Sequence, residues 1–192
     1  MRAHLVFCGP STAGKTTLML GLAKVPGEYD FTVDRTWTSR ARRPNEGNEE
    51  NIFVTPDEFE ANLHRFMLPF QTYPTYKYGI ERPQPLTSNE IRMRILMPVF
   101  ALKFRALVPE PTVICAISPF NSEPATIFNE RDPNVDVNDQ RARMSRFHSD
   151  RQAAEQVADL HFQNFSNVDL AVSALEATVL RHLSSRPDTA AT

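Results

Sequence analysis

The stretch that decides the fold is Gly9-Pro10-Ser11-Thr12-Ala13-Gly14-Lys15-Thr16-Thr17. It fits the phosphate-loop pattern G-x-x-x-x-G-K-[ST] in full, a pattern that requires a strand before it and a helix after it. The apolar run His4–Cys8 is typical of a buried parallel strand, and Lys15–Ala23 has the apolar spacing of a helix. Both flanks therefore match, and we predict an α/β fold built on a parallel sheet.

The chemistry of this loop explains its residues. Glycines let the backbone fold so that successive N–H groups face phosphate oxygens, and the following helix adds its positive end. Lys15 would neutralise the β and γ phosphates, and the Thr16 hydroxyl would ligate Mg²⁺. A decorative glycine-rich turn is the alternative. We predict an ATP-Mg²⁺ site whose nucleotide-binding residues are Gly9, Ser11, Thr12, Ala13, Gly14, Lys15, Thr16 and Thr17.

Further strands and helices alternate along the chain. The predicted strands are Phe31–Thr38, Ile52–Val54, irregular strands within Phe66–Tyr78, Ile91–Met97, Thr112–Ser118 and Leu160–Phe162. The predicted helices are Thr55 to about Arg65, one of about ten residues before Thr112, Asp139–Val157 and Val168–Leu183. This alternation predicts a parallel sheet flanked by helices, in a single domain over residues 1–183. The polar residues 184–192 are expected to be a flexible tail.

Composition excludes several functional classes. The 192 residues carry a net charge of −2, which gives no nucleic-acid footprint, and no run of 18 apolar residues predicts a membrane span. Cys8 and Cys115 both lie in apolar runs, so we expect buried free thiols in a reducing cytosol. His148 and His161 have no metal-ligand spacing. These features indicate a soluble cytoplasmic protein; they leave its oligomeric state open.

Three segments resemble the guanylate kinase family. They are Thr36-Trp37-Thr38-Ser39-Arg40-Ala41-Arg42-Arg43-Pro44, Asn51-Ile52-Phe53-Val54-Thr55-Pro56-Asp57-Glu58-Phe59 and Tyr76-Lys77-Tyr78-Gly79. The resemblance implies a P-loop kinase with a small acceptor-binding insert at about 38–82 and a lid at about 129–141. It also implies transfer of the γ-phosphate of ATP to a small acceptor that already carries a phosphate.

The resemblance implies roles for the acceptor-side residues. Arg40 and Arg43 would grip the acceptor's phosphate, which agrees with the fixed fork that a guanidinium presents to phosphate oxygens. Arg42 is expected to be solvated instead. The full set of predicted acceptor-binding residues is Thr36, Arg40, Arg43, Asn51, Tyr78 and Gly79.

The chain departs from guanylate kinases where the family reads guanine. Ile80 follows the glycine where the family has Thr or Ser. Apart from the base, Asn51 replaces a tyrosine that contacts the acceptor's phosphate, so that contact is lost or replaced. No carboxylate stands at the positions that would take guanine's donors, Pro69, Gln71 and Thr72, and the Asp-rich strand end is replaced by Leu96-Met97-Pro98-Val99. This pattern is similar to ribose 1,5-bisphosphate phosphokinase. A nucleoside monophosphate and a ribose bisphosphate both stay open as acceptors, and GMP is predicted to be a poor one.

The resemblance also implies a lid that brings arginines to the transferred phosphate. With Lys15, the catalytic residues would be Arg131 on the arm and Arg143 on the return helix; a salt-bridged surface is the alternative. Asn164 lies where the family often contacts adenine, although a plain turn residue fits equally. Asp34 could orient a water on Mg²⁺, but we favour a pair with a neighbouring Arg.

Two other functions compete with a kinase. Some guanylate-kinase-like domains bind phosphopeptides without catalysis, but their phosphate loops are usually broken, whereas Gly14, Lys15 and Thr16 are intact here. An ATPase or GTPase would need an acid closing an apolar strand, and Ile91–Met97 and Thr112–Ser118 offer none.

Overall fold

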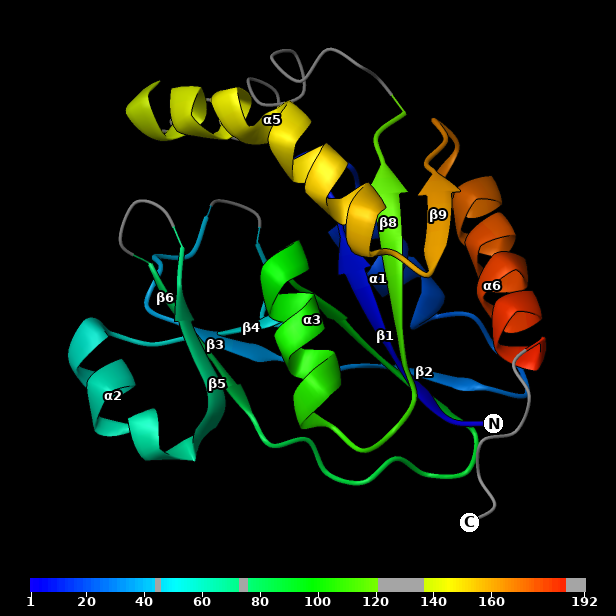
Figure 1. Ribbon diagram of the computed structural model, residues 1–192, viewed down its shortest axis with the longest axis horizontal. Helices are drawn as coiled ribbons and strands as arrows, with labels where there is room; N and C mark the ends of the chain where they lie inside the picture. The colour runs from blue at the N-terminus through cyan, green and yellow to red at the C-terminus, as the bar shows by residue number, and fades with distance from the viewer. Residues whose placement is uncertain (44–45, 73–75, 121–136, 186–192) are drawn as a thin grey trace.

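A five-stranded parallel sheet forms the centre of the structure, a computed structural model that describes residues 1–43, 46–72, 76–120 and 137–185 (Figure 1). Its strand order is β2-β7-β1-β8-β9, and every neighbouring pair is parallel. The strands are β1 (Ala3–Cys8), β2 (Asp30–Val33), β7 (Glu90–Ile95), β8 (Thr112–Ser118) and β9 (Leu160–Gln163). The predicted α/β class is therefore confirmed.

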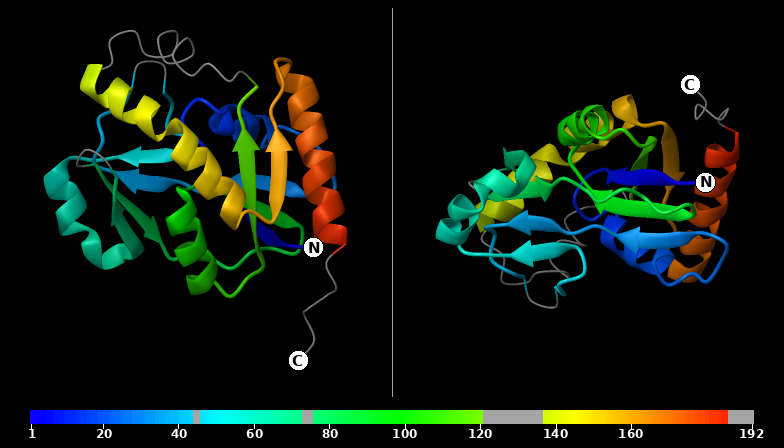
Figure 2. Two further views of the ribbon diagram at one scale, coloured as in Figure 1. Left: turned by 45° about the horizontal axis from the view of Figure 1, so that its top comes forward. Right: turned by 90° about the horizontal axis from the view of Figure 1, so that it is seen from below.

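Helices cover both faces of this sheet because its central strands are apolar on both sides (Figure 2). Leu5 and Phe7 of β1 point into one core cluster, and Val6 and Cys8 point into the other. The first cluster packs under α1 and α6, and the second under α3 and α5. The helices are α1 (Lys15–Leu22), α3 (Pro98–Leu107), α5 (Val137–Val157) and α6 (Val168–Ser184).

A smaller mixed sheet lies beside the first, with strand order β4-β3-β6-β5. Its strands are β3 (Thr36–Thr38), β4 (Asn51–Phe53), β5 (Phe66–Gln71) and β6 (Lys77–Glu81). Aromatic rings hold it to α2 (Pro56–Ala61) and the short 3₁₀ turn η1 (Leu63–Arg65): the Phe66 ring lies 4.9 Å from Phe59 and 5.7 Å from Trp37. This sheet is the part of the fold that carries the predicted acceptor side.

The start of α2 follows its sequence signal. The Thr55 hydroxyl accepts from the Glu58 N–H, the Glu58 carboxylate accepts from the Thr55 N–H, and Pro56 occupies the first turn. Thr55 and Glu58 thus form a capping box, which explains why the helix begins where the sequence predicts. The helix is shorter than expected, because it ends at Ala61 and the chain continues as η1.

The predicted strand Phe31–Thr38 is wrong as a single element, because it divides between the two sheets. β2 ends at Val33 and β3 begins at Thr36. At the break, the Asp34 carboxylate pairs with Arg94 of β7, and the Thr36 N–H donates to the Glu50 carbonyl at 3.0 Å. The chain therefore leaves one hydrogen-bonded ladder at Asp34 and joins another two residues later.

The C-terminal half agrees with the sequence closely, and α5 runs from β8 toward the small sheet in Figures 1 and 2. The arm and most of the predicted lid lie outside the described residues, as does the tail after Ser185. Cys8 and Cys115 are free and buried as predicted, and burial raises the pKa of each thiol to about 12. None of the helices in the described ranges has the length and apolarity that spanning a bilayer requires.

Candidate active site

Two glycines shape the phosphate loop between β1 and α1. Gly9 and Gly14 have φ values of 142° and 81°, which side-chain-bearing residues rarely adopt. A Cβ on Gly9 would lie 2.4 Å from the Ile117 carbonyl oxygen, and one on Gly14 would lie 2.3 Å from the Asn164 amide nitrogen. The loop is thus pressed against the ends of β8 and β9, and glycine is required at both positions.

Asn164 braces this loop from the end of β9. Its Nδ2 donates to the Ala13 carbonyl at 3.0 Å, and its own N–H donates to the Ser118 carbonyl at 3.0 Å. Its Oδ1 accepts from the Phe165 N–H at 2.8 Å. Asn164 therefore does more than form a turn, because it fixes the loop at the residue before Gly14.

Lys15 and Thr16 occupy the mouth of the loop at the start of α1. The Lys15 ammonium donates to the carbonyls of Gly9 and Pro10, at 2.9 and 2.7 Å. The Thr16 hydroxyl donates to the Glu50 carboxylate at 2.9 Å. Both side chains thus lie where the motif predicts, but Glu50 is a neighbour that sequence reasoning missed.

Arg40 is held by a carboxylate that the sequence analysis also missed. Its two terminal nitrogens donate to Glu46 at 2.9 and 2.6 Å, and Glu46 also accepts from the Arg43 N–H at 3.0 Å. Burial opposes the charge on Arg40, but the bonds and charge of Glu46 and Tyr78 outweigh it and raise its pKa. Burial likewise opposes ionisation of Glu46, yet Arg40 and the Arg43 N–H lower its pKa. A fixed, fully charged pair results.

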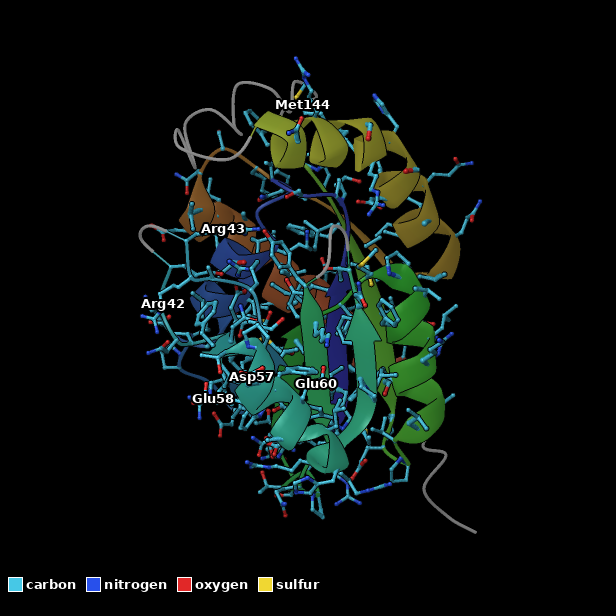
Figure 3. All side chains as sticks on the ribbon, turned by 90° about the vertical axis from the view of Figure 1, so that its left-hand side faces the viewer. Arg42, Arg43, Asp57, Glu58, Glu60 and Met144 are labelled. Carbon is cyan, nitrogen blue, oxygen red and sulfur yellow. The ribbon has the colours of Figure 1, made fainter. Side chains whose placement is uncertain are left out.

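Arg42 and Arg43 are adjacent in sequence and differ in their surroundings. Arg43 is half-buried and lines the main cavity, whereas Arg42 is exposed, with its guanidinium 5.0 Å from the centre of the Phe53 ring. In Figure 3 Arg42 lies at the outer edge of the molecule, on the solvent side of Arg43. The expected solvation of Arg42 is confirmed.

A cavity of about 720 Å³ joins the phosphate loop to the small sheet. From the loop it is lined by Gly9, Ser11, Thr12, Gly14, Lys15, Thr16 and Thr17. From the predicted acceptor side it is lined by Thr36, Arg40, Arg43, Asn51 and Tyr78. Three described residues of the predicted site do not line it. Ala13 is buried, Gly79 is packed so closely that a Cβ would lie 2.6 Å from the Phe66 ring, and Asn164 contacts the loop at Ala13.

The far wall of the cavity is aromatic. Phe70 stacks on Tyr78 and on Phe100, with ring centres 5.3 and 4.2 Å apart, and Thr72 and Tyr76 complete the wall. Ile80 was expected to face the acceptor, and this is wrong. It is on the same face of β6 as Tyr78 but two residues further along the strand, where it is fully buried with Leu68 and Phe104 in the core beneath α3.

The helix α5 contributes Arg146 and Asp150 to the same cavity. Burial raises the pKa of Asp150, although the nearby charges of Arg146 and Lys15 oppose that shift. Arg131 and the side chain of Arg143 lie outside the described residues. Arg146 and Asp150 are thus the described residues of α5 that line the cavity.

Asp34 lies at the carboxyl end of β2, where its predicted pairing with an arginine is confirmed. Its partner, Arg94, is 1 % exposed and lies 4.3 Å from the centre of the Phe104 ring. Asp34 itself lines the cavity. The pair therefore fixes a carboxylate at the edge of the site from within the core.

Comparison with known proteins gives partial sequence matches and a broad structural one. No protein-family model matches the chain. It is 36% identical over 80 residues to the guanylate kinase of Salmonella typhi, covering 40% of this chain and 38% of that one. It is 42% identical over 62 residues to the guanylate kinase of Hyphomonas neptunium, covering 32% and 28%. The matches thus span under two fifths of these relatives' length.

The guanylate kinase structure from Anaplasma phagocytophilum superposes with a TM-score of 0.61, at 17% identity over 97% of this chain and 87% of that one. This likeness shows the fold. The resemblance predicted from the sequence is confirmed: the chain is guanylate kinase-like in its architecture and in part of its sequence.

Proposed function

We propose that this guanylate kinase-like chain is an ATP-dependent phosphotransferase that passes the γ-phosphate to a small acceptor already carrying a phosphate. One observation carries the proposal: a single cavity is lined by an intact phosphate loop on one side and by Arg40, Arg43 and Tyr78 on the other. In-line transfer between two phosphates needs both groups held in one place, and this arrangement supplies both holders.

The donor end of the cavity would take ATP. The backbone N–H groups of Gly9–Thr17 and the start of α1 favour phosphate oxygens, and Lys15 would turn from its own loop's carbonyls to the β and γ phosphates. Thr16 and Glu50 offer oxygen ligands of the kind that Mg²⁺ prefers, and bound Mg²⁺ would neutralise phosphate charge. Asn164, which is hydrogen-bonded to Ala13 of the loop, would reach the adenine side.

The acceptor end would hold a phosphate between arginines. Arg43 presents its guanidinium to the cavity, and Arg40 is fixed behind it by Glu46. Thr36, Asn51 and Tyr78 line the same surface and add neutral hydrogen-bonding groups. The insert at about 38–82 would thus be the acceptor-binding part of the single domain.

The lid would complete the site. Arg131 and Arg143 are proposed to place charge on the transferred phosphoryl group, where donors fixed in advance are most effective. Arg146, which reaches the cavity from the same helix as Arg143, supports this assignment. The two buried thiols fit a reducing compartment such as the cytoplasm, which is where we place the reaction.

The aromatic wall argues against guanine as the acceptor's base. Phe70, Tyr76 and Tyr78 can stack on a ring or cover a sugar. Among the described residues of this wall, Thr72, which follows β5, is the one further polar side chain. Two guanine donors left unpaired would cost about 1–3 kcal/mol each, or roughly 10²–10⁴-fold together. We therefore expect GMP to be a poor acceptor.

Acceptor-dependent ADP release tests this proposal. Purified protein with ATP and Mg²⁺ is assayed against the nucleoside monophosphates and ribose bisphosphate, with Lys15→Ala as the inactive control. We expect one of these acceptors to stimulate release strongly and GMP to do so weakly. Release unaffected by every acceptor would contradict a phosphotransferase. A kcat/KM for GMP of about 10⁵ M⁻¹s⁻¹ or better, above every other acceptor, would restore an ordinary guanylate kinase.

A further inference from the structure

Glu50 holds its carboxylate against the phosphate loop from the small sheet. Its Oε2 accepts the hydrogen bond of the Thr16 hydroxyl at 2.9 Å, across 34 positions of sequence. Its backbone is fixed as well, because its carbonyl accepts from the Thr36 N–H at 3.0 Å just before β4 begins. Glu50 therefore connects the two halves of the cavity at the residue that the motif assigns to Mg²⁺.

In the described part of the chain, three other carboxylates line the cavity. Asp150 comes from α5 and lies near the charges of Arg146 and Lys15, and the other two are bound to arginines. Asp34 pairs with Arg94, and Glu46 takes both terminal nitrogens of Arg40. Glu50 is instead positioned by a hydrogen bond from the neutral hydroxyl of Thr16. A carboxylate placed on a hydroxyl keeps its full negative charge for a cation that enters the cavity.

β7, one of the two strands that pair with β1, does not supply an acid at this point. β7 ends at Ile95, and the cavity wall continues as Leu96 and Met97, which are apolar. In the part of the chain that the structure describes, no group of three or more His, Cys, Asp or Glu residues is placed to hold a metal. A cation would therefore depend on one or two protein oxygens and on phosphate, which is how Mg²⁺ is commonly held at nucleotides.

We propose that Glu50 is the acidic residue that anchors Mg²⁺ with Thr16, taking the place of an acid at the strand end. By accepting the Thr16 hydrogen, Glu50 directs the lone pairs of that hydroxyl oxygen away from itself and toward the cavity. Its second oxygen is left to accept from the cation's water shell. This inference rests on the proposed ATP site, and it places the metal anchor on the acceptor-side sheet.

The test is whether replacing Glu50 weakens or strengthens nucleotide binding when Mg²⁺ is present and when it is absent. The affinity for a non-hydrolysable ATP analogue is measured calorimetrically in EDTA and in excess MgCl₂, for the wild type, Glu50→Gln and the matched control Glu49→Gln, whose side chain is exposed. In MgCl₂ we expect Glu50→Gln to bind about tenfold more weakly than the wild type. In EDTA we expect it to bind equally well or more tightly, because a negative charge near the phosphates has been removed. Glu49→Gln should match the wild type in both.

Each of the other possible results contradicts either the role of Glu50 in holding Mg²⁺ or the ATP site itself. Equal weakening in both conditions, or no change in either, would show that Glu50 has only a structural role. If Glu50→Gln does not fold, Glu50→Asp is used for the same test. Its carboxylate is one methylene further from the cation, so Mg²⁺ should increase its affinity for the analogue less than it does for the wild type. A wild-type protein that binds the analogue in neither condition would instead contradict the ATP site itself.

Discussion

Arg42 and Arg43 are adjacent in sequence, but Arg42 lies at the surface and Arg43 lines the cavity. Arg43 faces the cavity and its backbone is tied to Glu46, whereas Arg42 lies over the Phe53 ring at the surface and bonds to Asn48. A charged hydrogen bond to phosphate contributes about 1.5–3 kcal/mol, while a surface arginine over a ring contributes far less to a reaction. The pair is therefore a natural comparison for the acceptor site.

Arg43→Ala should raise the KM for the acceptor by roughly 10–100-fold, which corresponds to the loss of one such bond. The KM for ATP should stay within about twofold of the wild type, because Arg43 belongs to the proposed acceptor side and its backbone is tied to Glu46 rather than to the phosphate loop. Steady-state kinetics with each substrate varied in turn measures both. Arg42→Ala is the control and should leave both constants unchanged; an equal effect from the two substitutions would remove the acceptor-phosphate assignment.

For single residues, the sequence could locate those that belong to a strict local motif. It could not locate the residues that contact them from distant parts of the chain. Lys15 and Thr16 follow from the loop pattern, and Arg43 from its turn. Glu46 and Glu50 lie in a polar stretch that reads as a loop, and only the folded chain brings them to Arg40 and Thr16. Ile80 was misassigned because it shares a face of β6 with Tyr78, and only the folded chain shows that the core beneath α3 covers that face two residues further along.

At the scale of elements, β1 contains a histidine with no exposed surface. His4 lies edge-on against the Phe104 ring, 5.1 Å away, and its Nε2 is 3.7 Å from a carboxylate oxygen of Glu110. Burial, with a smaller contribution from the charge of Arg94, lowers the pKa of His4 to about 4. The strand therefore holds a neutral imidazole in the core at neutral pH.

This burial predicts a specific loss of stability in mild acid. The unfolded chain takes up the His4 proton near pH 6.5, but the folded chain does so only near pH 4, so stability falls as the pH drops through that window. The full loss is roughly 3 kcal/mol. Denaturant unfolding at several pH values should show that this loss is absent in His4→Met, which fills the site without titrating. A pH dependence unchanged by the substitution would contradict it.

Elements with a strong apolar period were predicted well, and the connection between the sheets was not. Thr112–Ser118 matches β8 residue for residue, because a fully apolar run can only be buried. Phe31–Thr38 has equally good strand residues throughout, and nothing local marks the change of sheet at Asp34. That break depends on Arg94, which is 60 positions further along the chain.

At the scale of the whole molecule, the proposed function depends on how the two sheets face one cavity. The large sheet presents the phosphate loop at the carboxyl ends of its strands, and the small sheet presents arginines, Tyr78 and Glu50. α5 packs on α3 and β8 and adds Arg146 and Asp150 to the same space. An ATP-hydrolysing switch would need only the first of these surfaces, so the destination of the phosphate is the decisive property.

The most direct test is therefore to identify where the γ-phosphate goes. The protein is incubated with ATP, Mg²⁺ and the acceptor that gives the highest ADP release, and the products are followed by phosphorus NMR. Our account predicts that ADP and a phosphorylated acceptor form in equal amounts, with a new phosphorus–phosphorus coupling on the acceptor, and that Lys15→Ala forms neither. Inorganic phosphate as the sole product besides ADP, with the acceptor unchanged, would contradict the account.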